Sequence, residues 1–177
     1  MQLASKRQKN QVVRDFARWA QNVNFIGYSS ARTLSDIAEF AHFQWALTAP
    51  SYVQPLFDSI TQRPGFLVAD IVYGRTATPD DAGFFLEKLT IVRSLKNIST
   101  FLPILLVESV TKETLKLLKD NKVVVALIDN VFDKNYTRLL GELVAVFANA
   151  GAIIVKNPSQ IEKLFTELSK AEGYHFL

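Results

Sequence analysis

The stretch from Leu102 to Asp129 decides the fold. It begins Leu102-Pro-Ile-Leu-Leu-Val-Glu-Ser109 and ends Lys122-Val-Val-Val-Ala-Leu-Ile-Asp129, with a short amphipathic segment between the two runs. Neither apolar run alternates with polar residues, which is typical of strands that are buried on both faces of a sheet. We therefore predict two parallel strands joined by a helical crossover.

Outward from this unit, apolar runs predict three more strands, at Asn24–Tyr28, Phe66–Tyr73 and Ala152–Lys156. Helical spacing of apolar residues fills the intervals, from about Gln8 to Gln21, Leu34 to Trp45, Val53 to Ile60, Phe85 to Leu95, Tyr136 to Phe147 and Ile161 to Leu168. Such alternation predicts an α/β fold in a single domain over residues 1–177. The expected class is a three-layer, mostly parallel five-stranded sheet with helices on both faces, Rossmann-like, flavodoxin-like or endonuclease-like.

Composition restricts the setting and the chemistry. The chain contains no cysteine, so disulfides and cysteine-ligated metal sites are excluded, and we expect a cytoplasmic protein. Residues 1–10 are polar and basic, unlike a signal peptide. The most apolar run, Leu143 to Val155, falls short of the roughly 20 residues that cross a bilayer, so no membrane partner is expected.

Positive charge is concentrated in the first predicted helix. Residues 1–20 carry a net charge of +4, whereas the remaining 157 residues sum to −1. Val12, Phe16, Trp19 and Val23 form an apolar stripe, and the arginines fall on the opposite face. A basic face can be simply solvated, or it can lie against phosphates. The candidate residues for binding DNA or RNA are Lys6, Arg7, Lys9, Arg14 and Arg18.

Several familiar sites are missing from the sequence. The seven glycines form neither a dinucleotide-binding fingerprint nor a phosphate loop. The two histidines, His42 and His175, are expected on a helix face and near the end of the chain, where neither favours a catalytic triad or a metal site.

Three acids are placed at or near the ends of predicted strands: Asp70, Glu108 and Asp129. Ligands bind beyond the carboxyl ends of parallel strands, and carboxylates are preferred ligands of Mg²⁺. These residues are therefore candidate metal ligands for phosphodiester chemistry. The alternative is that they cap the following helices or pair with Lys and Arg.

The rear of the chain, from about Leu102 to Gly173, resembles the later strand–helix–strand part of restriction-endonuclease-like proteins. The resemblance implies a fold of that group and a role in handling nucleic acid. The catalytic motif of that group is not matched, because Pro79-Asp80 lies in a predicted loop, Glu87-Lys88 lacks the intervening residue, and Asp120-Asn121-Lys122 falls in a turn.

Two other families are distantly similar. Asp70, Pro79, Gly83 and Lys156 resemble positions of a response-regulator receiver domain, although the paired acids of its first strand are missing. Leu-Leu-Val-Glu108 and Val-Ala-Leu-Ile-Asp129 resemble a toprim domain, which has Gly after the Glu where this chain has Ser109.

These observations favour a non-catalytic or degenerate α/β domain of a nucleic-acid-handling, restriction-endonuclease-like protein, acting in binding or in docking to other domains or protein partners. We expect it to be the N-terminal module of a longer protein, with no cofactor and with homo-oligomerisation left open. The alternatives are a Mg²⁺-dependent nuclease that uses Asp70, Glu108 and Asp129, and a receiver-like signalling domain phosphorylated on Asp70.

Overall fold

A computed structural model of the chain describes residues 2–22, 25–27, 30–34, 36–52 and 56–128. The elements are α1 (Gln2–Asn22), β1 (Arg32–Thr33), β2 (Glu39–Phe40), β3 (Phe43–Gln44), β4 (Leu47–Ser51), β5 (Gly65–Ala77), α2 (Pro79–Ser94), β6 (Phe101–Val110), α3 (Lys112–Asp120) and β7 (Val124–Leu127). The predicted helices after residue 130, the strand Ala152–Lys156 and the candidate ligand Asp129 lie outside the described residues.

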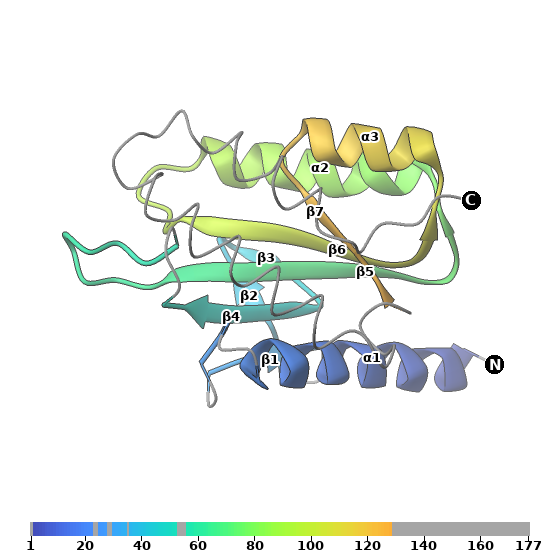
Figure 1. The fold of residues 1–177 in the computed structure, drawn as a ribbon, viewed down its shortest axis with the longest axis horizontal. Helices are drawn as coiled ribbons and strands as arrows, with labels where there is room; N and C mark the ends of the chain where they lie inside the picture. Colours follow the sequence, from blue (N-terminus) through green and yellow to red (C-terminus); the bar gives the residue numbers. More distant parts are fainter. Residues whose placement is uncertain (1, 23–24, 28–29, 35, 53–55, 129–177) are drawn as a thin grey trace.

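The described strands form a mixed five-stranded sheet in the order β1-β4-β5-β6-β7, and β2 and β3 form a separate hairpin. Helix α1 lies against one face of the sheet, and α2 and α3 cover the other (Figure 1). The α/β class is thus confirmed. Among the described strands the sheet is mixed rather than mostly parallel, because β5–β6 and β6–β7 are parallel whereas β1–β4 and β4–β5 are antiparallel.

The central crossover forms as its sequence predicts. Leu102–Val107 are all buried in β6, which pairs in parallel with β5 on one side and with β7 on the other. The Thr111 side chain caps α3 by accepting a hydrogen bond from the Thr114 backbone N–H. Leu118, within α3, is fully buried. Both faces of β6 are apolar because both are covered.

Strand β5 runs on to Ala77, four residues past its predicted end, and Pro79-Asp80, predicted to lie in a loop, begin helix α2. A register shift between Val72 and Thr76 accommodates the extra length, and Gly74 within it has φ of +86°, a value that glycine adopts without strain. Helix α2 then starts with Thr78 as its cap. Asp81 completes a capping box with Thr78.

The helix predicted from Leu34 to Trp45 is wrong, and of the helix predicted from Val53 to Ile60 the described residues, 56–60, are not helical. Ile37, Ala41 and His42 have φ of 59°, 53° and 68°, which no right-handed helix contains. Ala41 and His42 form the two-residue turn of the β2–β3 hairpin, with the geometry of a type I′ turn. Apolar residues at helical spacing were misleading here because consecutive short strands and turns reproduce the same spacing by chance.

The first predicted strand is also not found, because described residues 25–27 are outside any strand. Strand β4, which was not predicted, lies in the sheet between β1 and β5 and contains Pro50. A proline is tolerated there because β1 pairs only as far as Thr48, so no strand of the described residues needs a donor from Pro50.

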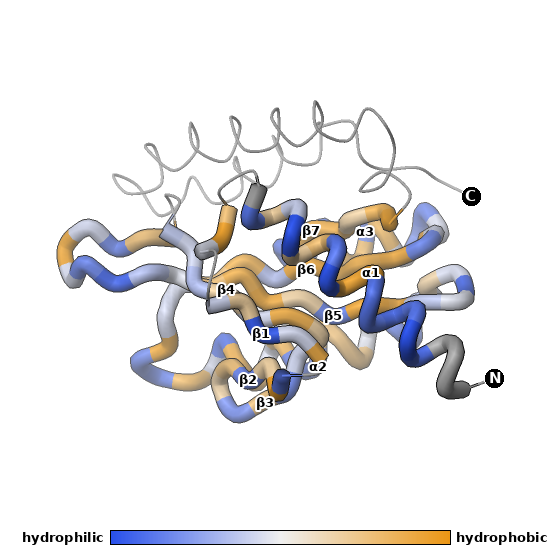
Figure 2. The backbone as a smooth tube through the Cα atoms, turned by 90° about the horizontal axis from the view of Figure 1, so that it is seen from below, coloured by the Kyte–Doolittle hydropathy of each residue, from blue (hydrophilic) through white to orange (hydrophobic). Residues whose placement is uncertain are grey.

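Two apolar clusters hold the layers together. One lies between α1 and the sheet and includes Val13, Phe16 and Leu106, and the other lies between the sheet and α2 with α3 and includes Leu89 and Leu105. In the hydropathy colouring of Figure 2, most of α1 is hydrophilic and the central strands are largely hydrophobic. No helix in the described part of the chain combines the length and the apolar character that a bilayer span requires.

Candidate functional site

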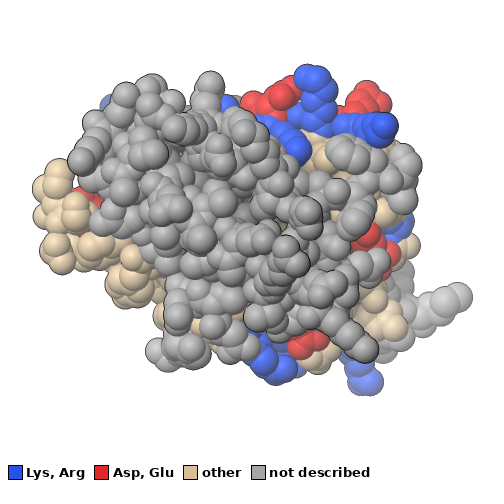
Figure 3. Space-filling model, viewed as in Figure 1, with Lys and Arg blue, Asp and Glu red and all other residues tan. Residues whose placement is uncertain are grey.

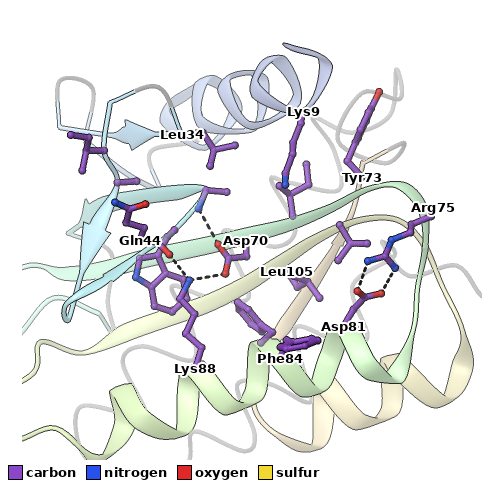
Figure 4. A pocket seen from close by; sticks show the side chains of 17 residues that line it. Lys9, Leu34, Gln44, Asp70, Tyr73, Arg75, Asp81, Phe84, Lys88 and Leu105 are labelled. Carbon is purple, nitrogen blue, oxygen red and sulfur yellow. Dashed lines mark hydrogen bonds and ion pairs between the residues drawn. The ribbon is translucent and has the colours of Figure 1, made fainter. Parts of the chain in front are cut away.

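A cavity of about 520 Å³ lies between α1 and α2, beside the middle of β5 (Figure 4). Strand β4 pairs with β5 only from Gly65 to Ala69, so the edge of β5 beyond Ala69 has no strand partner among the described residues. The cavity occupies the space that a longer β4 would fill, and its lining comes from α1, the segment before β4, β5, α2 and Leu105 of β6.

The open edge of β5 presents main-chain groups to the cavity. The Ala69 carbonyl faces this edge, since it accepts a hydrogen bond from the Ala46 N–H at 2.9 Å. The Phe66 N–H faces the opposite edge, since it donates to the Thr100 carbonyl. Because main-chain groups alternate along a strand, the N–H and C=O groups of Ile71 and Tyr73 point toward the cavity edge, as those of Ala69 do.

Helix α2 contributes one face to the cavity. Asp81, Phe84 and Lys88 follow one another at spacings of three and four, so they lie in a row along the helix, and all three line the cavity. Phe84 is 77% exposed, an unusual state for an aromatic side chain that nothing covers. The exposure of Phe84 is explained neither by the apolar character of phenylalanine nor by a place in a buried core.

Lys88 is held in place by three groups. Its Nζ donates to Asp70 Oδ2 at 2.9 Å and to the Gln44 carbonyl, and it lies 3.7 Å from the centroid of the Trp45 ring. Trp45 is in turn fixed by a hydrogen bond from its Nε1 to the Phe40 carbonyl. A carboxylate, a carbonyl and an aromatic face are suitable partners for the ammonium group of Lys88, whose side chain is only 17% exposed.

Asp70 therefore ties three segments together. Its Oδ1 accepts a hydrogen bond from the Ala46 N–H at 3.0 Å, while Oδ2 accepts from Lys88. The first bond holds the chain just before β4, and the second holds α2 against the sheet. The position that a cation would take beside Oδ2 is already held by the Lys88 ammonium group.

Arg75 and Asp81 form a second ion pair at the far end of the cavity. Arg75 donates two hydrogen bonds to the Asp81 carboxylate, which also accepts from the Thr78 N–H. The bonds from the Arg75 guanidinium lower the pKa of Asp81 from 3.8 to about 2, and the bonds from Thr78 act in the same direction. This pair fixes the corner at which β5 passes into α2.

Substituting Asp81→Asn should lower the free energy of unfolding by about 1 kcal/mol near neutral pH, a modest value because Arg75 is more than half exposed. The depressed pKa means that the ionised carboxylate stabilises the fold above pH 4, and that this contribution disappears as the pH falls toward 2. Urea denaturation between pH 2 and 7 should show the wild type and the variant converging at the acid end. A difference in stability between wild type and Asp81→Asn that stays constant at all pH values would contradict the stabilising role of the ionised Asp81 carboxylate.

Lys9 brings an unbalanced positive charge to the cavity. It occupies the position one turn before Val13 on the inward stripe of α1, and its side chain extends from the helix toward β5 (Figure 4). It is half-buried and forms no hydrogen bond or ion pair with any described residue, in contrast to Lys88 and Arg75. The carboxylates of Asp70 and Asp81 are each matched by one cation, so Lys9 leaves the lining with a net positive charge.

The rim of the cavity is apolar and partly strained. Three of the eight exposed large hydrophobic side chains in the described residues line it, namely Leu34, Ile37 and Phe84. Ile37 is 70% exposed and adopts a φ of 59°, which is unfavourable for a β-branched residue. Strained residues persist where their surroundings enforce them, often at binding sites.

The other predicted nucleic-acid-binding residues are gathered on α1. Lys6, Arg7, Arg14 and Arg18 are all exposed, and Arg18 also lies 3.7 Å from Asp15. In the view of Figure 3, basic side chains protrude along the edge of the molecule where α1 lies. The structure thus places four of the five predicted cations on the surface of α1 and the fifth, Lys9, in the cavity.

The predicted acidic cluster is placed differently. Asp70 lies in the middle of β5 rather than near its end, and it pairs in register with Leu105 of β6. Glu108 is three residues further along β6, about 10 Å away along the sheet, and strand alternation directs it to the opposite face. Within the described part of the chain no three His, Cys, Asp or Glu side chains come together as a metal site, and Asp129 lies outside it.

Sequence reasoning did not identify Lys88, Trp45 or Phe84 as site residues. Lys88 was considered only as part of an unmatched nuclease motif, and Trp45 was assigned to a helix that does not form. One signal was available for Lys9, because it replaces an apolar residue in the series Lys9, Val13, Phe16, Ala20.

The comparisons with known proteins add no relative. No family model, no curated protein and no solved structure matched the chain. The cavity and the basic surface of α1 are therefore the features from which a function can be proposed.

Proposed function

We propose that the chain is a non-catalytic α/β domain that binds nucleic acid through α1 and the adjoining cavity. The supporting observation is that one helix supplies Lys9, the cation inside the cavity, together with four exposed cations: Lys6 on the side of Lys9, and Arg7, Arg14 and Arg18 on the opposite side of the helix. Lys6 lies one turn before Lys9 on the same side of α1, so positive charge continues from the surface into the cavity.

The charge arrangement favours a polyanion. Lysine and arginine side chains bind phosphates with release of counterions, and this contribution does not depend on base sequence. Seventeen acids balance most of the twenty cations over the whole chain, whereas α1 retains a local excess of positive charge. Phosphates along α1 would relieve the repulsion between neighbouring cations.

The state of the acids supports binding without catalysis. Asp70 is paired with Lys88, and Asp81 is paired with Arg75. A Mg²⁺-dependent nuclease would require Asp70 to exchange the Lys88 ammonium group for a metal ion, and among the described residues no group of three His, Cys, Asp or Glu side chains comes together to hold one. We therefore propose a binding role and assign no catalytic residue.

The proposal predicts the effect of replacing Arg7, Arg14 and Arg18 together by alanine. Affinity for DNA or RNA should fall by roughly tenfold or more at low salt, because three phosphate contacts are lost. The dependence of log K on log salt should also become shallower by about two for a single strand. Fluorescence anisotropy of a labelled oligonucleotide over a salt series measures both quantities.

A control variant with Arg63, Lys96 and Lys116 replaced by alanine removes the same net charge from exposed positions outside α1. It should retain nearly the full affinity and slope. If the two triple variants weaken binding equally, net charge alone governs retention and the assignment to α1 is wrong.

The proposal also includes a fold group and a cellular location. The antiparallel pairing of β4 with β5 speaks against a flavodoxin-like sheet, whose strands are parallel. An endonuclease-like fold is proposed on the resemblance of the β6–α3–β7 unit and its surroundings to that group. A cytoplasmic location is proposed because the chain contains no cysteine.

A further inference from the structure

We infer that the cavity holds a single unpaired nucleotide, so that the domain prefers single-stranded to double-stranded nucleic acid. The inference rests on the proposed function and adds the form of nucleic acid that is bound. Its basis is the combination of an uncovered aromatic ring, one unbalanced cation and an open strand edge around one cavity.

Phe84 provides a surface for a base. Its ring is 77% exposed and lies on the row of α2 residues that faces the cavity. Bases of single strands stack on aromatic side chains whatever their sequence, because every base has an aromatic face. In a duplex both faces of each base are already stacked, so only an unpaired base can use this ring.

Lys9 provides the partner for the phosphate. It extends into the cavity from the α1 side, whereas Phe84 comes from α2 on the other side of β5 (Figure 4). A nucleotide carries its base at one end and its phosphate at the other, so its two ends would meet Phe84 and Lys9. Lys6, one turn away on α1, would meet the next phosphate along the strand.

The open edge of β5 provides hydrogen-bonding groups between these two ends. Ile71 and Tyr73 each offer an N–H donor and a C=O acceptor at the cavity edge. The pairing edge of every base carries both donors and acceptors, and in a duplex these are occupied by the opposite strand. Main-chain groups can therefore satisfy an unpaired base without selecting one sequence.

The size of the cavity is consistent with one nucleotide. Its volume of about 520 Å³ lies within the range of small-ligand sites. The apolar rim of Leu34 and Ile37 would cover the base and sugar. An extended peptide could also pair with the β5 edge, but the positive charge that continues onto α1 favours the nucleic acid.

The test compares a labelled single-stranded oligonucleotide with the same sequence as a duplex, using wild type and Phe84→Ala. Wild type should bind the single strand more tightly, and Phe84→Ala should weaken single-strand binding by about tenfold while leaving duplex binding unchanged. Phe84→Trp should retain the preference, and Ile60→Ala, which removes another exposed apolar side chain away from the cavity, should bind as wild type does.

A second measurement locates the ligand. Addition of a nucleoside 5′-monophosphate should change the fluorescence of Trp45, which lines the cavity, and Lys9→Met should abolish most of that response. Equal binding of single strand and duplex, unaffected by Phe84→Ala, would overturn the inference while leaving the proposed function intact. A Trp45 response to an extended acidic peptide but not to the nucleotide would also overturn it. If wild type binds neither form of nucleic acid, the proposed function fails as well.

Discussion

Replacing Gly65 by alanine should lower the free energy of unfolding by at least about 3 kcal/mol, or prevent folding. A methyl group at this position would lie 2.4 Å from the Leu56 carbonyl oxygen, and 2.7 Å from both Leu56 Cβ and the Thr100 carbonyl oxygen. Two of these three atoms belong to the main chain, so a change of rotamer cannot relieve the overlap. The chain must separate at the start of β5, where the Thr100 carbonyl accepts a hydrogen bond from the Phe66 N–H.

The matched control is Gly83→Ala. Gly83 lies on the exposed side of α2, and an added methyl group meets nothing within 4 Å. The same chemical change should therefore stabilise the protein by about 0.5–1 kcal/mol, because alanine favours a helix more than glycine does. Urea denaturation followed by circular dichroism measures both variants. A Gly65→Ala variant within 1 kcal/mol of wild type would show that β5 and the segment before it do not approach as closely as described.

The second large effect is expected for Asp70→Ala, with a loss of about 2–3 kcal/mol in the free energy of unfolding. Lys88 would keep the Gln44 carbonyl and the Trp45 ring as partners. Its positive charge would, however, lose its counterion, although the Lys88 side chain is only 17% exposed. The Ala46 N–H would also lose one of its two acceptors. Asp80→Ala, at an exposed position in the first turn of α2, should change stability by less than about 0.5 kcal/mol.

A double-mutant cycle isolates the contribution of the pair. Because Asp70→Ala leaves an uncompensated ammonium group, removing it as well by Lys88→Met should recover part of the loss. The double variant should therefore be more stable than the sum of the single effects predicts, by about 1–2 kcal/mol. Strict additivity would show that the Asp70–Lys88 contact contributes nothing to stability.

The same variants bear on the nuclease and receiver hypotheses. If Asp70 bound Mg²⁺, millimolar Mg²⁺ should raise the melting temperature of the wild type and not that of Asp70→Ala. If Asp70 accepted phosphate, a small phosphodonor should label it. Asp129 is best tested by nuclease assays of wild type and Asp129→Ala with Mg²⁺, since loss of activity on substitution would defeat the binding role.

The parts of the fold that the sequence predicted correctly are those with local, redundant signals. Residues 101–127 combine two uninterrupted apolar runs with a capped helix between them, and only one local arrangement buries both runs. The terminal helix was likewise predicted by its stripe, although the fully buried position is Val13 rather than Val12. In both regions, local preference and tertiary burial agree.

The region from residue 30 to 64 was mispredicted because its structure depends on distant partners. Leu47–Ser51 form a strand only by pairing with β5, and the segment before it is anchored by Asp70 and Lys88, more than twenty residues away. Left-handed conformations at Ala41 and His42 carry no sequence signal, since glycine or asparagine is the usual choice there. Strand directions were therefore wrong at this edge of the sheet.

The candidate site, too, could be predicted only in part from the sequence. The basic residues could be named from composition, but the cavity arises because β4 ends before β5 does, which no local pattern reveals. Phe84 was indistinguishable from its neighbour Phe85 in sequence, yet Phe84 is exposed at the cavity and Phe85 is buried against Trp45.

The central claim is that α1 and the cavity bind nucleic acid through several cations acting together. The most direct measurement is the affinity of the wild-type chain for a labelled single-stranded oligonucleotide over a series of salt concentrations. The claim predicts that log K falls linearly with log salt, with a slope of about −2 to −4 for the three to five cations available. Absence of binding at low salt, or an affinity that does not change with salt, would contradict it.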